Sequence, residues 1–230
     1  MREASILFLW WVIFAGTHTV MSGQLFRSKL QGFLGPRGFV TLYTLIAAAT
    51  ITPLCWYYGE HRHTGPQLWI TLFPYMMSRD LNILLMVLAF ALLFSGLVQT
   101  APSSILSSSE PKAYGVTRLT RHPAFAAFFL FAIAHLLVAG ALTDVVFFGG
   151  FVVYSWFGAL RQDQRKIASV PGYESFCAET SFLPFGAIIS GQQPFPRGEL
   201  RWSVIILGLV AFYLVRAFHP ILFGGILMTL

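Results

Sequence analysis

The 230-residue chain is 56% hydrophobic and only 10% charged, and its formal net charge is +6. This composition excludes a water-soluble globular domain and is typical of a protein that crosses the membrane several times. A positive charge would suit a nucleic-acid partner in a soluble protein, but no nucleic acid is needed here, because the distribution of the charge along the membrane segments explains it.

Six stretches are long and apolar enough to cross a bilayer, which takes about 20 residues. They cover residues 5–23, 38–58, 81–98, 124–141, 144–160 and 203–220. The run Leu34-Gly35-Pro36-Arg37 predicts a turn before the second span. Only Ala141-Leu142-Thr143 separates spans four and five, which predicts an antiparallel helical hairpin. The stretch from Ser181 to Gly191 is apolar but short and is broken by proline and glycine.

We therefore predict an all-α, polytopic membrane bundle of about six transmembrane helices, with an interfacial or re-entrant segment between spans five and six, forming one domain over residues 1–230. The first span lacks a small-residue cleavage pattern, so we expect it to be kept as a membrane anchor. Eleven Lys and Arg residues follow spans one, three and five, against three on the other side. This bias predicts that the odd-numbered loops are cytoplasmic and that both termini lie outside.

Two histidines, His18 in the first span and His135 in the fourth, interrupt otherwise apolar stretches. An imidazole in hydrocarbon is costly, so it normally faces a partner or a cofactor. Imidazole is a common ligand of haem iron, and surroundings rich in Phe, of which the chain has 23, suit a porphyrin better than a bare divalent ion. The alternative is that each imidazole bonds to a backbone carbonyl or a serine on a neighbouring helix.

A third histidine, His122, opens the fourth span beside Arg121. It lies 13 residues from His135, about 20 Å along one helix, so one metal cannot bind both. Arg121 and His122 are candidates to bind a haem propionate or a lipid phosphate, and capping of the helix is the alternative for His122. The remaining histidines are expected in solvent or at the membrane interface: His61, His63 and His219.

The run Gly115-Val-Thr-Arg-Leu-Thr-Arg-His-Pro123, followed by Ala134-His135-Leu136-Leu137, resembles the NnrU family. That family includes membrane proteins linked to denitrification and the 15-cis-zeta-carotene isomerases. The loop His61-Arg62-His63-Thr64-Gly65-Pro66-Gln67-Leu68-Trp69 and the stretch from Thr180 to Ile188 are similar to the isomerase branch. The likeness extends over nearly the whole chain.

The resemblance implies a haem b, held by histidines between helices, and a cis-to-trans isomerisation of a polyene such as a poly-cis carotene. On this chain the implied iron ligands and catalytic residues are His18 and His135. The isomerase carries a cysteine three residues before the second histidine, where this chain has Ala132, so ligation by two histidines is the simpler expectation. The expected partners are a lipophilic polyene and the membrane lipids.

Three other functions stay open on the sequence. One is a non-enzymatic haem or denitrification accessory protein of the NnrU type. Another is methyl transfer, because Arg121-His122-Pro123 ahead of a helical hairpin also resembles isoprenylcysteine and phospholipid methyltransferases. Thr117 and the pair Asp163-Gln164 depart from that pattern, where a tyrosine and two acidic residues are expected. The last is a plain structural membrane subunit.

Overall fold

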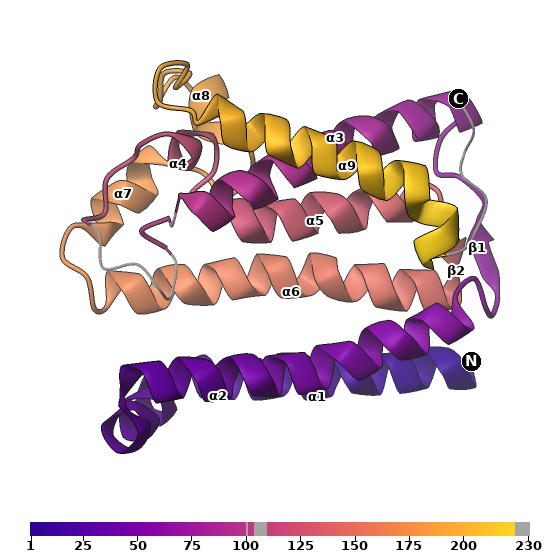
Figure 1. Ribbon diagram of the computed structural model, residues 1–230, viewed down its shortest axis with the longest axis horizontal. Helices are drawn as coiled ribbons and strands as arrows, with labels where there is room; N and C mark the ends of the chain where they lie inside the picture. Colours follow the sequence, from indigo (N-terminus) through magenta and orange to yellow (C-terminus); the bar gives the residue numbers. More distant parts are fainter. Residues whose placement is uncertain (100, 104–109, 224–230) are drawn as a thin grey trace.

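Six apolar helices form the body of the protein in the computed structural model, which describes residues 1–99, 101–103 and 110–223 (Figure 1). They are α1 (Arg2–Ser22), α2 (Gln24–His61), α3 (Tyr75–Val98), α5 (Pro123–Leu136), α6 (Leu142–Ile167) and α9 (Trp202–Phe223). Packing contacts link α2 to α1, α1 to α6, α6 to α5, α5 to α3 and α3 to α9. The helices therefore follow one another across the bundle in that order.

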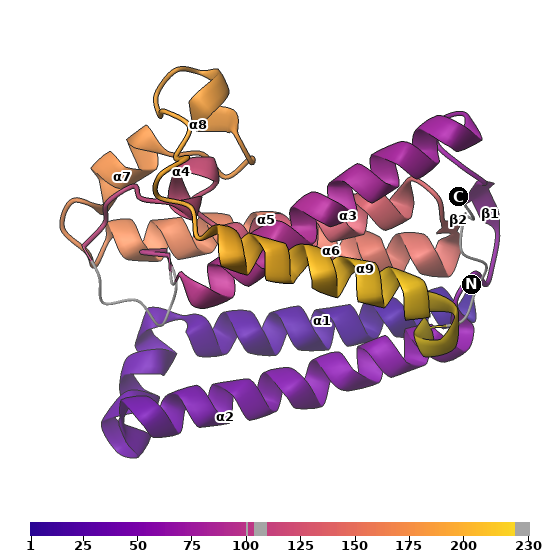
Figure 2. The same cartoon turned by 45° about the horizontal axis from the view of Figure 1, so that its top comes forward.

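The two ends of the bundle differ in structure (Figures 1 and 2). One end, called here the helical end, carries the short helices α4 (Val116–Leu119), α7 (Tyr173–Glu179) and α8 (Gly186–Ile189) and the turn between α1 and α2. The other, the strand end, carries β1 (Gln67–Trp69) and β2 (Gly140–Ala141), which pair antiparallel. The connections after α1, α3 and α6 all lie at the helical end. The membrane side that this end faces stays a prediction.

The all-α fold class is confirmed, and one predicted span is corrected. Five helices of the described chain are long and apolar enough to cross a membrane, whereas α5 has only 14 residues. Its length of about 21 Å falls short of the roughly 30 Å hydrocarbon core. The sequence predicted a span through residue 141, but the helix ends at Leu136, because the chain turns there and residues 140–141 pair with β1.

The other local predictions concern turns. Gly35, whose φ is +70°, breaks α2 as the sequence indicated, so that residues 24–34 run at an angle to the rest of the helix. The short connection between α5 and α6 does produce two neighbouring helices. The apolar stretch from Ser181 to Gly191 lies across the helical end, where the backbone N–H of Phe185 donates to the carbonyl of Leu119 over 2.8 Å.

An aromatic core joins α1, α2, α5 and α6. Its buried members are Leu7, Trp11, Phe14, Leu54, Ala132, Phe147 and Phe148. Gly150 on α6 gives the Trp11 indole room to approach, because a Cβ at that position would overlap the ring. Close packing of α1 on α6 therefore depends on a glycine, and it places the part of α1 that carries His18 against α6.

Candidate functional site

His18 lies half-buried between α1, α2 and α6. Its Nε2 is hydrogen-bonded to the hydroxyl of Tyr43 on α2. Its ring stacks on Phe14, at a centroid distance of 5.4 Å, and meets the edge of Tyr154 on α6 at 5.8 Å. The intramembrane imidazole thus has a polar partner on a neighbouring helix, as its cost in hydrocarbon requires.

His135 lies in the last turn of α5. Its Nδ1 is 2.8 Å from the carbonyl oxygen of Phe131, one turn earlier, and its ring stacks on Phe148 at 4.5 Å. A hydrogen bond from Nδ1 to a carbonyl fixes the tautomer and leaves Nε2 as the acceptor nitrogen. Metal-binding histidines use this arrangement, and so do histidines that are simply satisfied in a core.

The structure does not bring His18 and His135 together. His18 contacts Tyr154 and His135 contacts Phe148, which are six residues, or about 9 Å, apart along α6. The two rings share no ring neighbour among the contacts of the described chain. Haem ligation by both residues stays a prediction.

His219, which the sequence analysis expects at the membrane interface, lies on α9 near the end of the described helix. The helix continues past it, through Pro220, to Phe223. Its Nδ1 is buried and has no hydrogen-bond partner within the described residues. A test of iron binding therefore has to include His219 as well as His18.

Arg121 and His122 belong to a buried cluster around Asp163 at the helical end. Asp163, near the end of α6, accepts from Arg121 Nε over 2.8 Å, from His122 Nε2 over 2.8 Å and from the Tyr173 hydroxyl over 2.9 Å. The His122 side chain has no exposed surface, and its Nδ1 lies 3.1 Å from Gln162 Oε1. Asp163 is thus paired with cations, and one carboxylate ties α5, α6 and α7 together.

Arg121 and His122, which the sequence analysis names as candidates to bind a cofactor, are hydrogen-bonded within this cluster. Arg121 also donates from Nη1 to the carbonyl of Thr180 over 2.9 Å, and both ring nitrogens of His122 have protein partners. A haem propionate, a lipid phosphate or a methyl donor would have to displace Asp163 or Gln162 to bond to a ring nitrogen of His122. The geometry gives methyl transfer no support, and cofactor binding by Arg121 and His122 stays a prediction.

Cys177 on α7 lies beside the cluster and yields a chemical prediction. Burial, followed by the charge of Asp163, raises the pKa of its thiol to about 11. The thiol then holds roughly a hundredfold less reactive thiolate at neutral pH than one with the ordinary pKa. In a Cys55→Ala variant, we expect Cys177 to react with iodoacetamide far more slowly at pH 8 in the folded protein than in SDS. Equal rates, measured by mass spectrometry, would contradict the burial of Cys177.

A second ion pair fixes α4. Arg118 donates from Nε to both carboxylate oxygens of Glu199, at 3.1 and 2.9 Å, and Gly115 N donates to the same carboxylate over 2.7 Å. The hydrogen bond from Arg118 lowers the pKa of Glu199. Gly115 has a φ of +57°, and a side chain there would overlap Gln99. Gly115, the first residue of the run that resembles the NnrU family, is therefore required by its backbone conformation and by its close approach to Gln99 at the end of α3.

At the strand end, the loop that resembles the isomerase branch folds onto the start of α6. Asp144, fully buried, accepts from the Tyr58 hydroxyl over 2.9 Å and is bonded to His63 Nδ1 over 2.9 Å. Thr64 and Thr143 join the same two segments: Thr143 N donates to the Thr64 carbonyl, and Thr64 N donates to the Thr143 hydroxyl. The sequence predicted a solvated His63, and its side chain is indeed 57% exposed, although its Nδ1 is bonded to Asp144.

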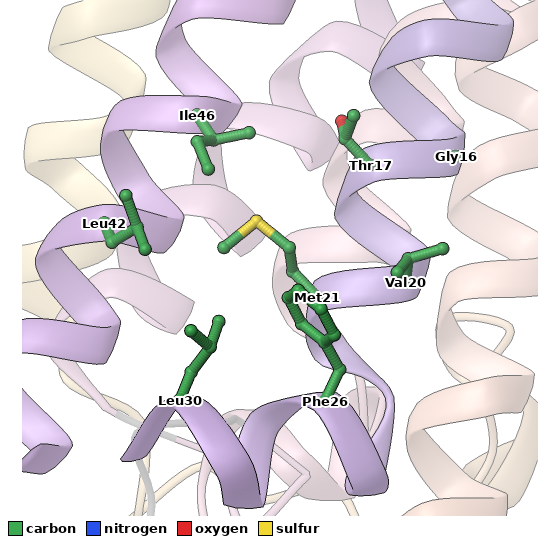
Figure 3. Close-up of a pocket in the computed structure, with 8 residues that line it drawn as sticks. All are labelled: Gly16, Thr17, Val20, Met21, Phe26, Leu30, Leu42 and Ile46. Carbon is green, nitrogen blue, oxygen red and sulfur yellow. The ribbon is translucent and has the colours of Figure 1, made fainter. Parts of the chain in front are cut away.

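An open, apolar groove lies between α1 and the two parts of α2. Its volume is about 530 Å³, within the range of ligand sites. Figure 3 shows Met21 reaching from α1 toward Leu42, with Leu30 and Phe26 on the first part of α2 beneath it. Its one polar lining side chain, that of Thr17, is bonded to the carbonyl of Ile13 over 2.8 Å. The groove therefore offers a surface only for hydrocarbon.

The comparison with known proteins agrees with this membrane fold. The chain is 27% identical to 15-cis-zeta-carotene isomerase, chloroplastic, of Zea mays over 198 residues, which are 84% of this chain and 52% of that protein. It is 27% identical to the protein of the same name from Arabidopsis thaliana over 225 residues, 93% of this chain and 59% of that protein. The chain thus spans little more than half the length of these relatives. No solved structure matches it. The sequence profile of the family described as NnrU protein matches residues 6–226, and the chain belongs to this family.

Proposed function

We propose that this membrane protein catalyses the cis-to-trans isomerisation of a double bond in a long polyene. The observation that carries the proposal is the similarity to the two 15-cis-zeta-carotene isomerases, which covers 84% and 93% of this chain. The chain matches just over half of each relative, so their activity is transferred here as a proposal. The hydrocarbon-lined groove supports a substrate of the same chemical class.

The groove between α1 and α2 is the proposed binding site of the polyene. Isomerisation about a double bond transfers no atoms between molecules. The protein must therefore chiefly hold and orient the polyene while the order of the reacting double bond is lowered. Met21, Leu30 and Leu42 supply apolar walls without a hydrogen-bonding group to trap water. His18 and Tyr43 follow the lining residues Thr17 and Leu42 directly, so a polar pair lies behind the groove.

A pigment assay tests the activity. The protein is co-expressed with enzymes that produce a poly-cis zeta-carotene in a host lacking any isomerase, and the carotene isomers are separated by chromatography in the dark. We expect the 15-cis bond to be converted to trans. Unchanged isomers from a folded, membrane-inserted protein would overturn the proposal and favour a non-enzymatic accessory role.

Filling the groove should slow the reaction. Gly16 lines the groove and has no neighbouring atom within 4 Å of an added Cβ, so a Gly16→Phe side chain enters it without a backbone clash. We expect at least about a tenfold slower conversion, equivalent to about 1.4 kcal/mol. Gly59→Phe is the matched control, since Gly59 is equally unobstructed but lies outside the groove. Equal activity of the two variants would place the substrate elsewhere.

Haem binding is tested separately from activity. Detergent-purified protein from haem-supplied cells is examined by absorption, oxidised and reduced, for wild type and for the His18→Ala, His135→Ala and His219→Ala variants. Ligation by His18 and His135 predicts a Soret band that shifts or disappears in both variants and is unchanged in His219→Ala. A folded wild-type protein without a Soret band would contradict the prediction that the protein binds haem. The pigment assay would still test the isomerisation.

A further inference from the structure

A polar pocket of about 290 Å³ lies at the helical end, between the first part of α2 and the end of α6. Three cationic side chains line it: Arg27 from α2, and Arg165 and Lys166 from α6. Ser28, Gln31 and Ser169 add hydroxyl and amide groups, and no lining residue is a carboxylate. A concave site with several cations and hydrogen-bond donors is suited to an anion with several oxygen atoms.

Both α2 and α6 contribute cationic side chains to this pocket. On α2, Arg27, Ser28 and Gln31 are separated by helical spacing and therefore share one face. The same holds for Arg165 and Ser169 on α6. Arg27 and Arg165 are close enough to repel each other, and both repel Lys166. Three positive charges therefore face one pocket, where their attraction for an anion adds together.

Two of the cationic groups are held in place. Arg165 donates from Nη1 to the carbonyl of Ser22 over 3.1 Å, at the turn between α1 and α2. The guanidinium of Arg27 lies 5.7 Å from the centre of the Phe39 ring, a cation–π contact that steadies it. The site is therefore partly preorganised, which lowers the entropy that a ligand has to overcome.

We propose that this pocket binds a phosphate group, either the headgroup of an anionic lipid or a soluble phosphate. Guanidinium groups match phosphate oxygens in a two-pronged geometry, and the neighbouring ammonium adds charge. The pocket lies at the end of the bundle where the positively charged loops are, which is the end predicted to face anionic lipid headgroups. It shares neither residues nor chemistry with the apolar groove, so it does not depend on the proposed isomerisation.

The test uses full-length protein in a neutral detergent, with binding followed by native mass spectrometry and by thermal stabilisation. The probes are inorganic phosphate, a short-chain phosphatidylglycerol and, as the neutral comparison, a short-chain phosphatidylcholine. We expect phosphatidylglycerol or inorganic phosphate to bind and phosphatidylcholine not to bind. Preference for the lipid identifies a headgroup site, whereas equal binding of inorganic phosphate identifies a soluble ligand.

Arg27→Gln and Lys166→Gln should each weaken binding by about fivefold or more, since one cation near a phosphate contributes on the order of that factor. Lys29→Gln is the matched control, because it removes the same charge from the same part of α2 but does not line the pocket. Circular dichroism confirms that the variants keep their helices. Equal loss in Lys29→Gln, or no loss in the two pocket variants, would overturn the site.

Discussion

An Asp163→Asn variant is expected to lose about 3–5 kcal/mol of folding free energy, the largest effect of any single substitution considered. Asp163 is the acceptor shared by Arg121, His122 and Tyr173, and it is nearly buried. Asparagine keeps the volume but removes the charge, so a largely buried guanidinium is left uncompensated. The loss is measured by titrating the detergent-solubilised protein with SDS and following helix content by circular dichroism.

Asp80→Asn provides the control for this prediction. Asp80 is also paired with an arginine, Arg79, over 3.0 Å, but its side chain is 64% exposed. Exposed pairs contribute little, so we expect a change within about 1 kcal/mol. If Asp163→Asn and Asp80→Asn destabilise the protein equally, the carboxylate at the helical end does not hold α5, α6 and α7 together.

A Gly150→Val variant is expected to have the next largest effect. A side chain at Gly150 on α6 would overlap the indole of Trp11 on α1. Both helices carry buried core residues here, so neither can give way without opening the aromatic core. Overpacking of this kind costs about 1–3 kcal/mol and sometimes more. The same SDS titration measures the loss in stability.

The adjacent glycine is a matched control for that substitution. Gly149 lies on the same helix but has no atom within 4 Å of an added Cβ. Gly149→Val introduces the same side chain and the same helix propensity without a clash, so we expect it to retain near-native stability. A loss as large as that of Gly150→Val would show that valine itself, rather than contact with Trp11, weakens α6.

The sequence was sufficient to predict features that depend on local composition. Apolar length located the helices. Gly35 beside Pro36 located the break in α2, because glycine adopts turn conformations readily and proline disfavours a helical conformation in the residue before it. The span predicted from the sequence extended α5 too far, because residues 137–141 are as apolar as the helix before them. Their true structure is set by pairing with Gln67–Trp69, about 70 positions earlier, which local composition does not reveal.

The candidate site was predicted only in part for the same reason. The polar character of His18 was visible, but its partner Tyr43 depends on how α1 and α2 are rotated about their axes. The charge of Asp163 suits cationic neighbours, whereas the Tyr173 contact comes from α7 folding back on α6. The cationic pocket was also not foreseen, because Arg27 and Arg165 lie 138 positions apart in the sequence.

The shortness of α5 has a consequence for how the protein is made. A helix of about 21 Å cannot bridge the hydrocarbon core alone. The loop carrying Trp69 also bonds to the backbone at its end, where Trp69 Nε1 donates to the carbonyl of Leu136 over 2.8 Å. During synthesis, α5 should therefore stay near the insertion machinery until α6 emerges, and the two should enter the lipid together as one unit.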